Sequence, residues 1–150
     1  MGNAYKKKGD FDKAIECYEK AIKIKPDYHK AFYNIGIAYD EKEDFDKAIE
    51  CYKKAVEIKP DYHEALFNMG NAYDEIGEFD KAIECYEKSI KIKPDDYKAL
   101  FNMGFVYEFN KDYDNAKKCF KKYEEIMISK DLEITSTVKK HLEDFYKIHK

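Results

Sequence analysis

The residues of this 150-residue chain best suited to metal or redox chemistry are its four cysteines. Cys17, Cys51, Cys85 and Cys119 follow one another at a constant 34-residue step. Four thiolates can bind one zinc ion, and two pairs can form two disulfides. Zinc, however, requires all four sulfur atoms about 2.3 Å from one point. A disulfide requires Cα atoms less than about 7 Å apart.

The segment around the first three cysteines, FDKAIECY, recurs unchanged at residues 11–18, 45–52 and 79–86. Its Phe, Ala, Ile and Tyr residues fall on one side of a helix, and its Asp, Lys and Glu residues on the other. In stacked units, equivalent cysteines lie about one helix packing distance apart, ~10 Å, which is too far for either kind of site. We therefore interpret the cysteines as small apolar core residues in a reducing compartment, and expect no metal.

Other catalytic arrangements find little support in the sequence. The histidines are His29, His63, His141 and His149, and the first two are separated by the same step as the cysteines. We find no Ser–His–acid set, phosphate-binding loop or metal-spaced cluster. The sequence therefore predicts a protein that is not an enzyme and needs no cofactor.

Charge and hydropathy exclude further classes of function. The net charge is −3 with 39% charged residues, which indicates a surface of ion pairs rather than a nucleic-acid binder. No apolar run approaches the roughly 20 residues of a membrane span, and the N-terminal segment does not resemble a signal peptide. We expect a cytoplasmic protein that does not bind membranes.

The same step extends to other residue types without insertion or deletion. Glycine, alanine, proline and tyrosine columns keep it: Gly2, Gly36, Gly70, Gly104; Ala14, Ala48, Ala82, Ala116; Pro26, Pro60, Pro94; Tyr5, Tyr39, Tyr73, Tyr107. Each unit reads as two helices, for example 29–43 and 44–60, with apolar residues at helical spacing. Small residues such as Gly36 and Ala48 let the two helices approach closely. A constant step of helix pairs is typical of a solenoid.

The pattern of one unit resembles the tetratricopeptide repeat family. The matching positions are Phe32, Ile35, Gly36, Tyr39, Ala48, Tyr52, Ala55 and Pro60, followed by Leu66, Met69, Gly70, Tyr73, Ala82, Tyr86, Ser89 and Pro94. The resemblance implies an all-α fold, a right-handed α-solenoid of antiparallel helix pairs with a C-terminal capping helix. We expect a repeat array over 1–128, made of an incomplete repeat 1–28 and the repeats 29–62, 63–96 and 97–128, followed by a capping helix in 129–150.

Both ends of the array depart from the pattern. The first unit lacks about its first turn and a half, which predicts less cover over Tyr18, Ala21 and Ile22. In the last unit Tyr123 replaces a small residue and Ile128 replaces the proline, so its second helix should run longer. Residues 131–148 read as a first helix without a partner. We expect it to bury four apolar residues on the last unit: Ile134, Val138, Leu142 and Phe145.

In this family the first helices line a concave groove that binds peptides, and the resemblance implies a protein–protein interaction scaffold. The expected groove residues are Lys30, Tyr33, Asn34, Ile37, Phe67, Asn68, Asn71, Lys98, Phe101, Asn102 and Phe105. Asparagine amides can donate to and accept from a peptide backbone. The alternative is that these asparagines bond to neighbouring helices and order the stack.

Carboxylates follow at the mouth of the expected groove: Asp40, Glu41, Asp74, Glu75 and Glu108. An acidic rim favours a basic or mixed-charge partner, although such residues can also be an ordinary solvated face. The leading hypothesis is a scaffold that holds an extended peptide segment. The second is a self-assembling structural element, a weak homo-oligomer that stacks through its truncated N-terminal edge.

Overall fold

The computed structural model describes residues 1–149, and in that range it is all-α, with nine helices and no strand. The chain divides into two compact units. Unit 1 is Met1–Ile92, and unit 2 runs from Lys93 to the C-terminus. The all-α class agrees with the sequence prediction, because each repeat contributes one pair of helices joined by a short turn.

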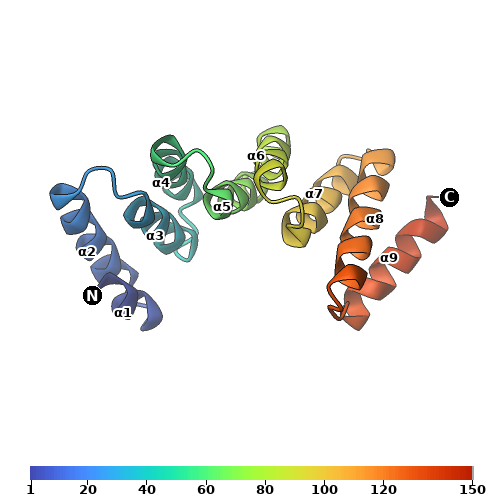
Figure 1. Ribbon diagram of the computed structural model, residues 1–150, viewed down its shortest axis with the longest axis horizontal. Helices are drawn as coiled ribbons and strands as arrows, with labels where there is room; N and C mark the ends of the chain where they lie inside the picture. The colour runs from blue at the N-terminus through green and yellow to red at the C-terminus, as the bar shows by residue number, and fades with distance from the viewer. Residues whose placement is uncertain (150) are drawn as a thin grey trace. The chain divides into compact units, whose positions relative to one another are not determined.

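Unit 1 contains three helix pairs (Figure 1). The pairs are α1 Gly2–Lys7 with α2 Phe11–Ile24, α3 His29–Asp40 with α4 Phe45–Ile58, and α5 His63–Glu75 with α6 Phe79–Ile92. Within unit 1, each helix from α1 to α5 packs against the next one along the chain, and α3 also contacts α5. The first helices of the second and third pairs therefore lie next to each other.

The FDKAIECY segment begins the second helix of each pair in unit 1, as its apolar spacing predicts. Asp10 caps α2, since its side chain accepts a hydrogen bond from the backbone N–H of Lys13. Ala48 and Tyr52 are completely buried in α4, while the Asp and Lys residues beside them are exposed. The repeated segment is thus a packing element.

The glycine column is explained by aromatic rings in the second helices. A Cβ atom at Gly36 would lie 2.5 Å from Cε1 of Tyr52, and one at Gly104 would lie 2.4 Å from Cε1 of Phe120. Real Cβ atoms do not approach a ring so closely, so a side chain there would require the ring or the helix that carries it to shift. The glycine admits a large buried ring between the helices of one pair.

Unit 2 contains α7 Tyr97–Phe109, α8 Tyr113–Ser129 and α9 Ser136–Ile148. Helix α8 has 17 residues, against 14 in each of α2, α4 and α6. The predicted lengthening of this second helix is therefore confirmed. It follows from the loss of the proline that would otherwise stop the helix.

The last helix begins five residues later than the predicted start at residue 131. Thr135 caps α9 by accepting from the backbone N–H of Val138, and residues 132–135 are not helical. Ile134 therefore precedes the helix and, like Val138, is only half-buried. Leu142 and Phe145 are each 2% exposed, so these two residues form the apolar contact of α9.

Candidate functional site

The first-helix face of unit 1 is the surface formed by α1, α3 and α5. Two of its aromatic residues, Tyr33 and Phe67, are half-buried. The Tyr33 ring lies 5.9 Å from that of Tyr52 and 5.0 Å from that of Tyr62. The Phe67 ring lies 6.1 Å from that of Tyr86. Both rings are therefore fixed by the core and present only part of their surface to solvent.

Asn34 and Asn68, which stand one repeat apart, form a first asparagine register and make hydrogen bonds along this face. Asn34 Oδ1 accepts from Lys6 Nζ at 2.8 Å, and Asn34 Nδ2 donates to the backbone oxygen of Lys30 at 2.7 Å. Asn68 Nδ2 donates to the Tyr33 hydroxyl at 3.2 Å. These bonds connect α1 with α3 and α3 with α5, so the asparagines do order neighbouring helices. An amide has two N–H groups and a carbonyl with two lone pairs, so one such bond does not exhaust it.

Asn3 and Asn71, which stand two repeats apart, form a second asparagine register that accepts hydrogen bonds from buried tyrosines. Asn71 Oδ1 accepts from the Tyr86 hydroxyl at 2.8 Å, and Asn3 Oδ1 accepts from the Tyr18 hydroxyl at 2.6 Å. In the repeat between them the asparagine position holds Ile37, which cannot accept a hydrogen bond. The register is thus a set of paired positions, in which the tyrosine follows the asparagine by 15 residues.

Two repeats lack the asparagine of the second register, and in each of them the ring on the second helix has a different partner. Next to Ile37, the Tyr52 hydroxyl donates instead to Asp40 Oδ2. In the last pair the ring is Phe120, which lacks a hydroxyl, and the asparagine position holds Phe105 at 5.6 Å from it. Sequence reasoning assigned Asn71 to ligand contact and missed its partner. The recurrence of an asparagine with a tyrosine at one fixed spacing was the signal that could have found it.

Asp40 is the most perturbed carboxyl group on the first-helix face of unit 1. Its Oδ1 atom is buried and has no hydrogen-bond partner among residues 1–149. Burial raises the pKa of Asp40 to about 6; the hydrogen bond from Tyr52 opposes the rise, and the charges of Glu41 and Glu75 add to it. Burial, followed by the charge of Glu75, also raises the pKa of Asp74. The predicted acidic rim in this unit therefore combines half-buried aspartates with exposed glutamates.

The corresponding face of unit 2 is carried by α7. Lys98 is exposed there, and Asn102 and Phe101 are half-buried. Glu108, the last member of the predicted rim, lies with Oε2 2.9 Å from Nε2 of His141 on α9. This carboxylate is therefore within hydrogen-bond distance of a histidine in unit 2.

The four cysteines are free thiols, of which Cys85 and Cys119 are buried and Cys17 and Cys51 half-buried. Burial raises the pKa of Cys51 and of Cys85 to about 11 in each case. Such thiols are poor nucleophiles at neutral pH. Across residues 1–149, no group of three or more His, Cys, Asp or Glu residues could hold a metal ion, and no helix is long and apolar enough to cross a membrane.

Models of one repeat family match almost the whole helix-pair region. A model described as TPR repeat matches residues 2–42, one described as Tetratricopeptide repeat matches 29–62 and 63–96, and a further one with that description matches 85–118. The chain belongs to the tetratricopeptide repeat family. The resemblance proposed from the repeated residues is confirmed.

Several solved structures similar to this chain are of MamA. One MamA crystal structure is 30% identical, covers 87% of this chain and 96% of its own, and has a TM-score of 0.68. MamA 41-end from Desulfovibrio magneticus RS-1 is 27% identical over 87% of this chain and 74% of its own, with a TM-score of 0.81. No curated protein matches the chain significantly. Family and relatives together support a protein-interaction scaffold with protein partners.

Proposed function

We propose that the first-helix faces hold an extended peptide segment of a partner protein, and that this segment is basic or of mixed charge. The proposed contact residues in unit 1 are Lys30, Tyr33, Asn34, Ile37, Phe67, Asn68 and Asn71, with the rim Asp40, Glu41, Asp74 and Glu75. Those in unit 2 are Lys98, Phe101, Asn102, Phe105 and Glu108. We further propose that the protein has no catalytic activity and works in the cytoplasm.

The observation that supports this proposal is the buried carboxyl group of Asp40. Its buried Oδ1 atom lacks a partner within the described residues, and Glu41 and Glu75 raise the local negative potential. A lysine or arginine side chain would supply both a donor and a countercharge. Charge complementarity of this kind mainly increases specificity and the association rate.

The test starts from a partner identified by pull-down and measures its affinity by calorimetry. We expect Asn68→Ala and Asn102→Ala together to weaken binding about tenfold, as lost hydrogen bonds worth about 1.4 kcal/mol would. Glu87→Ala, on the exposed surface of α6, is the control. Unchanged affinity in the asparagine variant would show that the amides serve only the stack.

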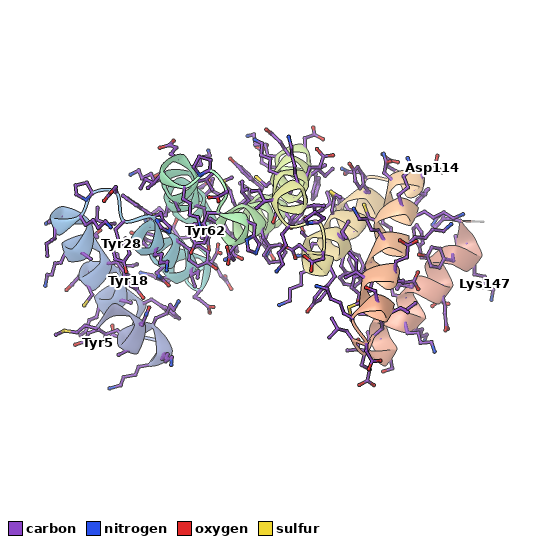
Figure 2. All side chains as sticks on the ribbon, viewed as in Figure 1. Tyr5, Tyr18, Tyr28, Tyr62, Asp114 and Lys147 are labelled. Atoms are coloured by element: carbon purple, nitrogen blue, oxygen red, sulfur yellow. The ribbon has the colours of Figure 1, made fainter. Side chains whose placement is uncertain are left out.

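A second candidate function is self-assembly through the N-terminal edge of unit 1. Ile24 is 87% exposed, whereas Ile58 and Ile92 at the equivalent positions are 36% and 39% exposed. Tyr28 is 37% exposed, whereas its equivalent Tyr62 is 9% exposed. Tyr18 and Tyr28 lie at the N-terminal end of unit 1 in Figure 2, where they help to line a hollow of about 420 Å³.

Exposed apolar side chains favour association, so we propose that a second copy covers this edge. Light scattering across a concentration series tests the idea, with Ile24→Lys as the variant that should prevent association. Ile24 is already exposed, so the substitution should leave the fold intact. A strictly monomeric wild-type protein at high concentration would exclude this function.

A further inference from the structure

Helix α7 carries phenylalanine at two positions where the two preceding repeats carry other residues. The place of Ile37 and Asn71 is taken by Phe105, and the place of Glu41 and Glu75 is taken by Phe109. With Phe101, these residues stand at i, i+4 and i+8 on α7, so they share one side of the helix. We call Phe101, Phe105 and Phe109 the phenylalanine stripe.

Neighbouring rings hold the middle of the stripe in place. The Phe105 ring lies edge-on to Phe101 at 4.7 Å and to Phe120 at 5.6 Å, and it lies 4.6 Å from the His141 ring. Despite these contacts Phe105 remains 37% exposed, and Phe109 is 71% exposed. The stripe is therefore a preformed apolar surface on a rigid element.

The charges around the stripe also differ from those of unit 1. Glu41 and Glu75 are exposed carboxylates at the position that Phe109 occupies. The carboxylate nearest in sequence, Glu108, is half-buried and lies 2.9 Å from Nε2 of His141. A charged side chain placed on the stripe would lose hydration against the apolar rings, whereas a neutral apolar side chain would gain burial.

We propose that the phenylalanine stripe binds a large apolar side chain, aromatic or aliphatic, of the partner peptide. This inference rests on the proposed function, because it assigns one subsite of the peptide-binding face. In this proposal α7 selects the apolar side chain of the ligand, and not its basic residues. Buried aromatic anchors of this kind dominate the energy of many interfaces.

The experiment uses labelled Gly/Ser/Lys peptides that differ only at a central residue, which is Phe, Leu, Ala or Gln. Binding is measured by fluorescence anisotropy and located by amide chemical shifts. The test variants are Phe109→Glu and Phe105→Asn, because the chain's own repeats carry Glu75 and Asn71 at these positions. Circular dichroism checks that both variants keep the helical fold.

We expect the Phe and Leu peptides to bind about tenfold more tightly than the Ala and Gln peptides, as burial of a large side chain predicts. Shifts should concentrate on α7, and Phe109→Glu should remove the preference. Equal affinity for all central residues, or a preference that survives in both variants, would overturn the inference. So would an absence of binding by the Phe peptide at millimolar concentration. If binding of lysine-rich peptides at unit 1 persists in these cases, the proposed function still stands.

Discussion

Gly70 on α5 lies directly against the Tyr86 ring on α6: a Cβ atom at position 70 would be 2.7 Å from Cε1 of that ring. Tyr86 is completely buried, so it cannot move aside into solvent. We expect Gly70→Ala to destabilise the protein by about 1–3 kcal/mol, the usual cost of overpacking a core. Thermal denaturation followed by circular dichroism measures the effect.

A double-mutant cycle shows whether the ring is the cause. In a Tyr86→Leu background the smaller side chain should relieve the clash, so the cost of Gly70→Ala should fall. An equal cost in both backgrounds would mean that the alanine acts through the backbone of α5 and not through Tyr86.

Much of the fold was predictable because the repeat imposes one helix-pair geometry on successive sequences. Gly36 was recognised as a close-approach residue from its spacing alone, although the structure shows that a tyrosine ring, rather than a neighbouring backbone, fills the space. The start of α9 was not predictable in this way. It depends on a local cap at Thr135 that lies outside the repeat pattern.

The candidate site was less predictable, because side-chain partners depend on distances between helices. Asn71 looks in the sequence like one more polar residue of the groove, yet its amide oxygen accepts from Tyr86. Glu108 looks like one more rim carboxylate, yet it contacts His141, which stands 34 residues after Tyr107 and so continues the tyrosine column on α9. Periodicity identifies the helix face of a residue, but not which neighbouring side chain it contacts.

The buried carboxyl of Asp40 should make stability depend on pH. Its pKa is about 6 in the folded protein, against 3.8 in the unfolded chain, so the folded state binds the proton more tightly. The protonated Asp40 carboxyl therefore stabilises the folded state relative to the ionised one. This stabilisation is fully present below about pH 4 and is lost as the pH rises through about 6. We expect Asp40→Asn to stabilise the protein by about 1–2 kcal/mol near pH 7.5, and by much less near pH 4.5.

The asparagine should keep the hydrogen bond from Tyr52, as Asn71 does with Tyr86. Glu57→Gln is the control, because Glu57 is exposed on α4 and, unlike Glu41, is not among the charges that raise the pKa of Asp40. A stability difference between Asp40→Asn and the wild type that stays constant from pH 4.5 to about 7.5 would contradict a proton-linked penalty.

The thiols of Cys51 and Cys85 should react slowly with alkylating reagents. Burial raises the pKa of each to about 11, so only about one thiol in a thousand is a thiolate near pH 8. We expect iodoacetamide to modify both residues much more slowly in the folded protein than in urea, as measured by peptide mass spectrometry. Modification of Cys85 at the rate of the unfolded chain would show that α6 opens readily.

The last prediction concerns α9, which covers one side of the α7–α8 pair. Phe145 packs edge-on against Phe120 at 5.1 Å, the Tyr146 hydroxyl donates to Glu124 at 2.8 Å, and Leu142 is 2% exposed. Burying side chains such as Leu142 and Phe145 contributes about 1.5–3 kcal/mol each before ordering costs. We expect truncation after Lys130 to lower the melting temperature and to promote aggregation, because it uncovers Phe120.

The full-length variant Lys139→Ala, on the exposed side of α9, serves as the control and should behave like the wild type. Because repeat arrays lose structure first at an unprotected end, the helices of unit 1 should remain folded in the truncated chain and its ligand contacts should persist. An unchanged melting temperature would show that α9 adds no stability. Stronger partner binding after truncation would instead identify α9 as an autoinhibitory segment, because removal of a pure cap can only weaken or preserve the site that it supports.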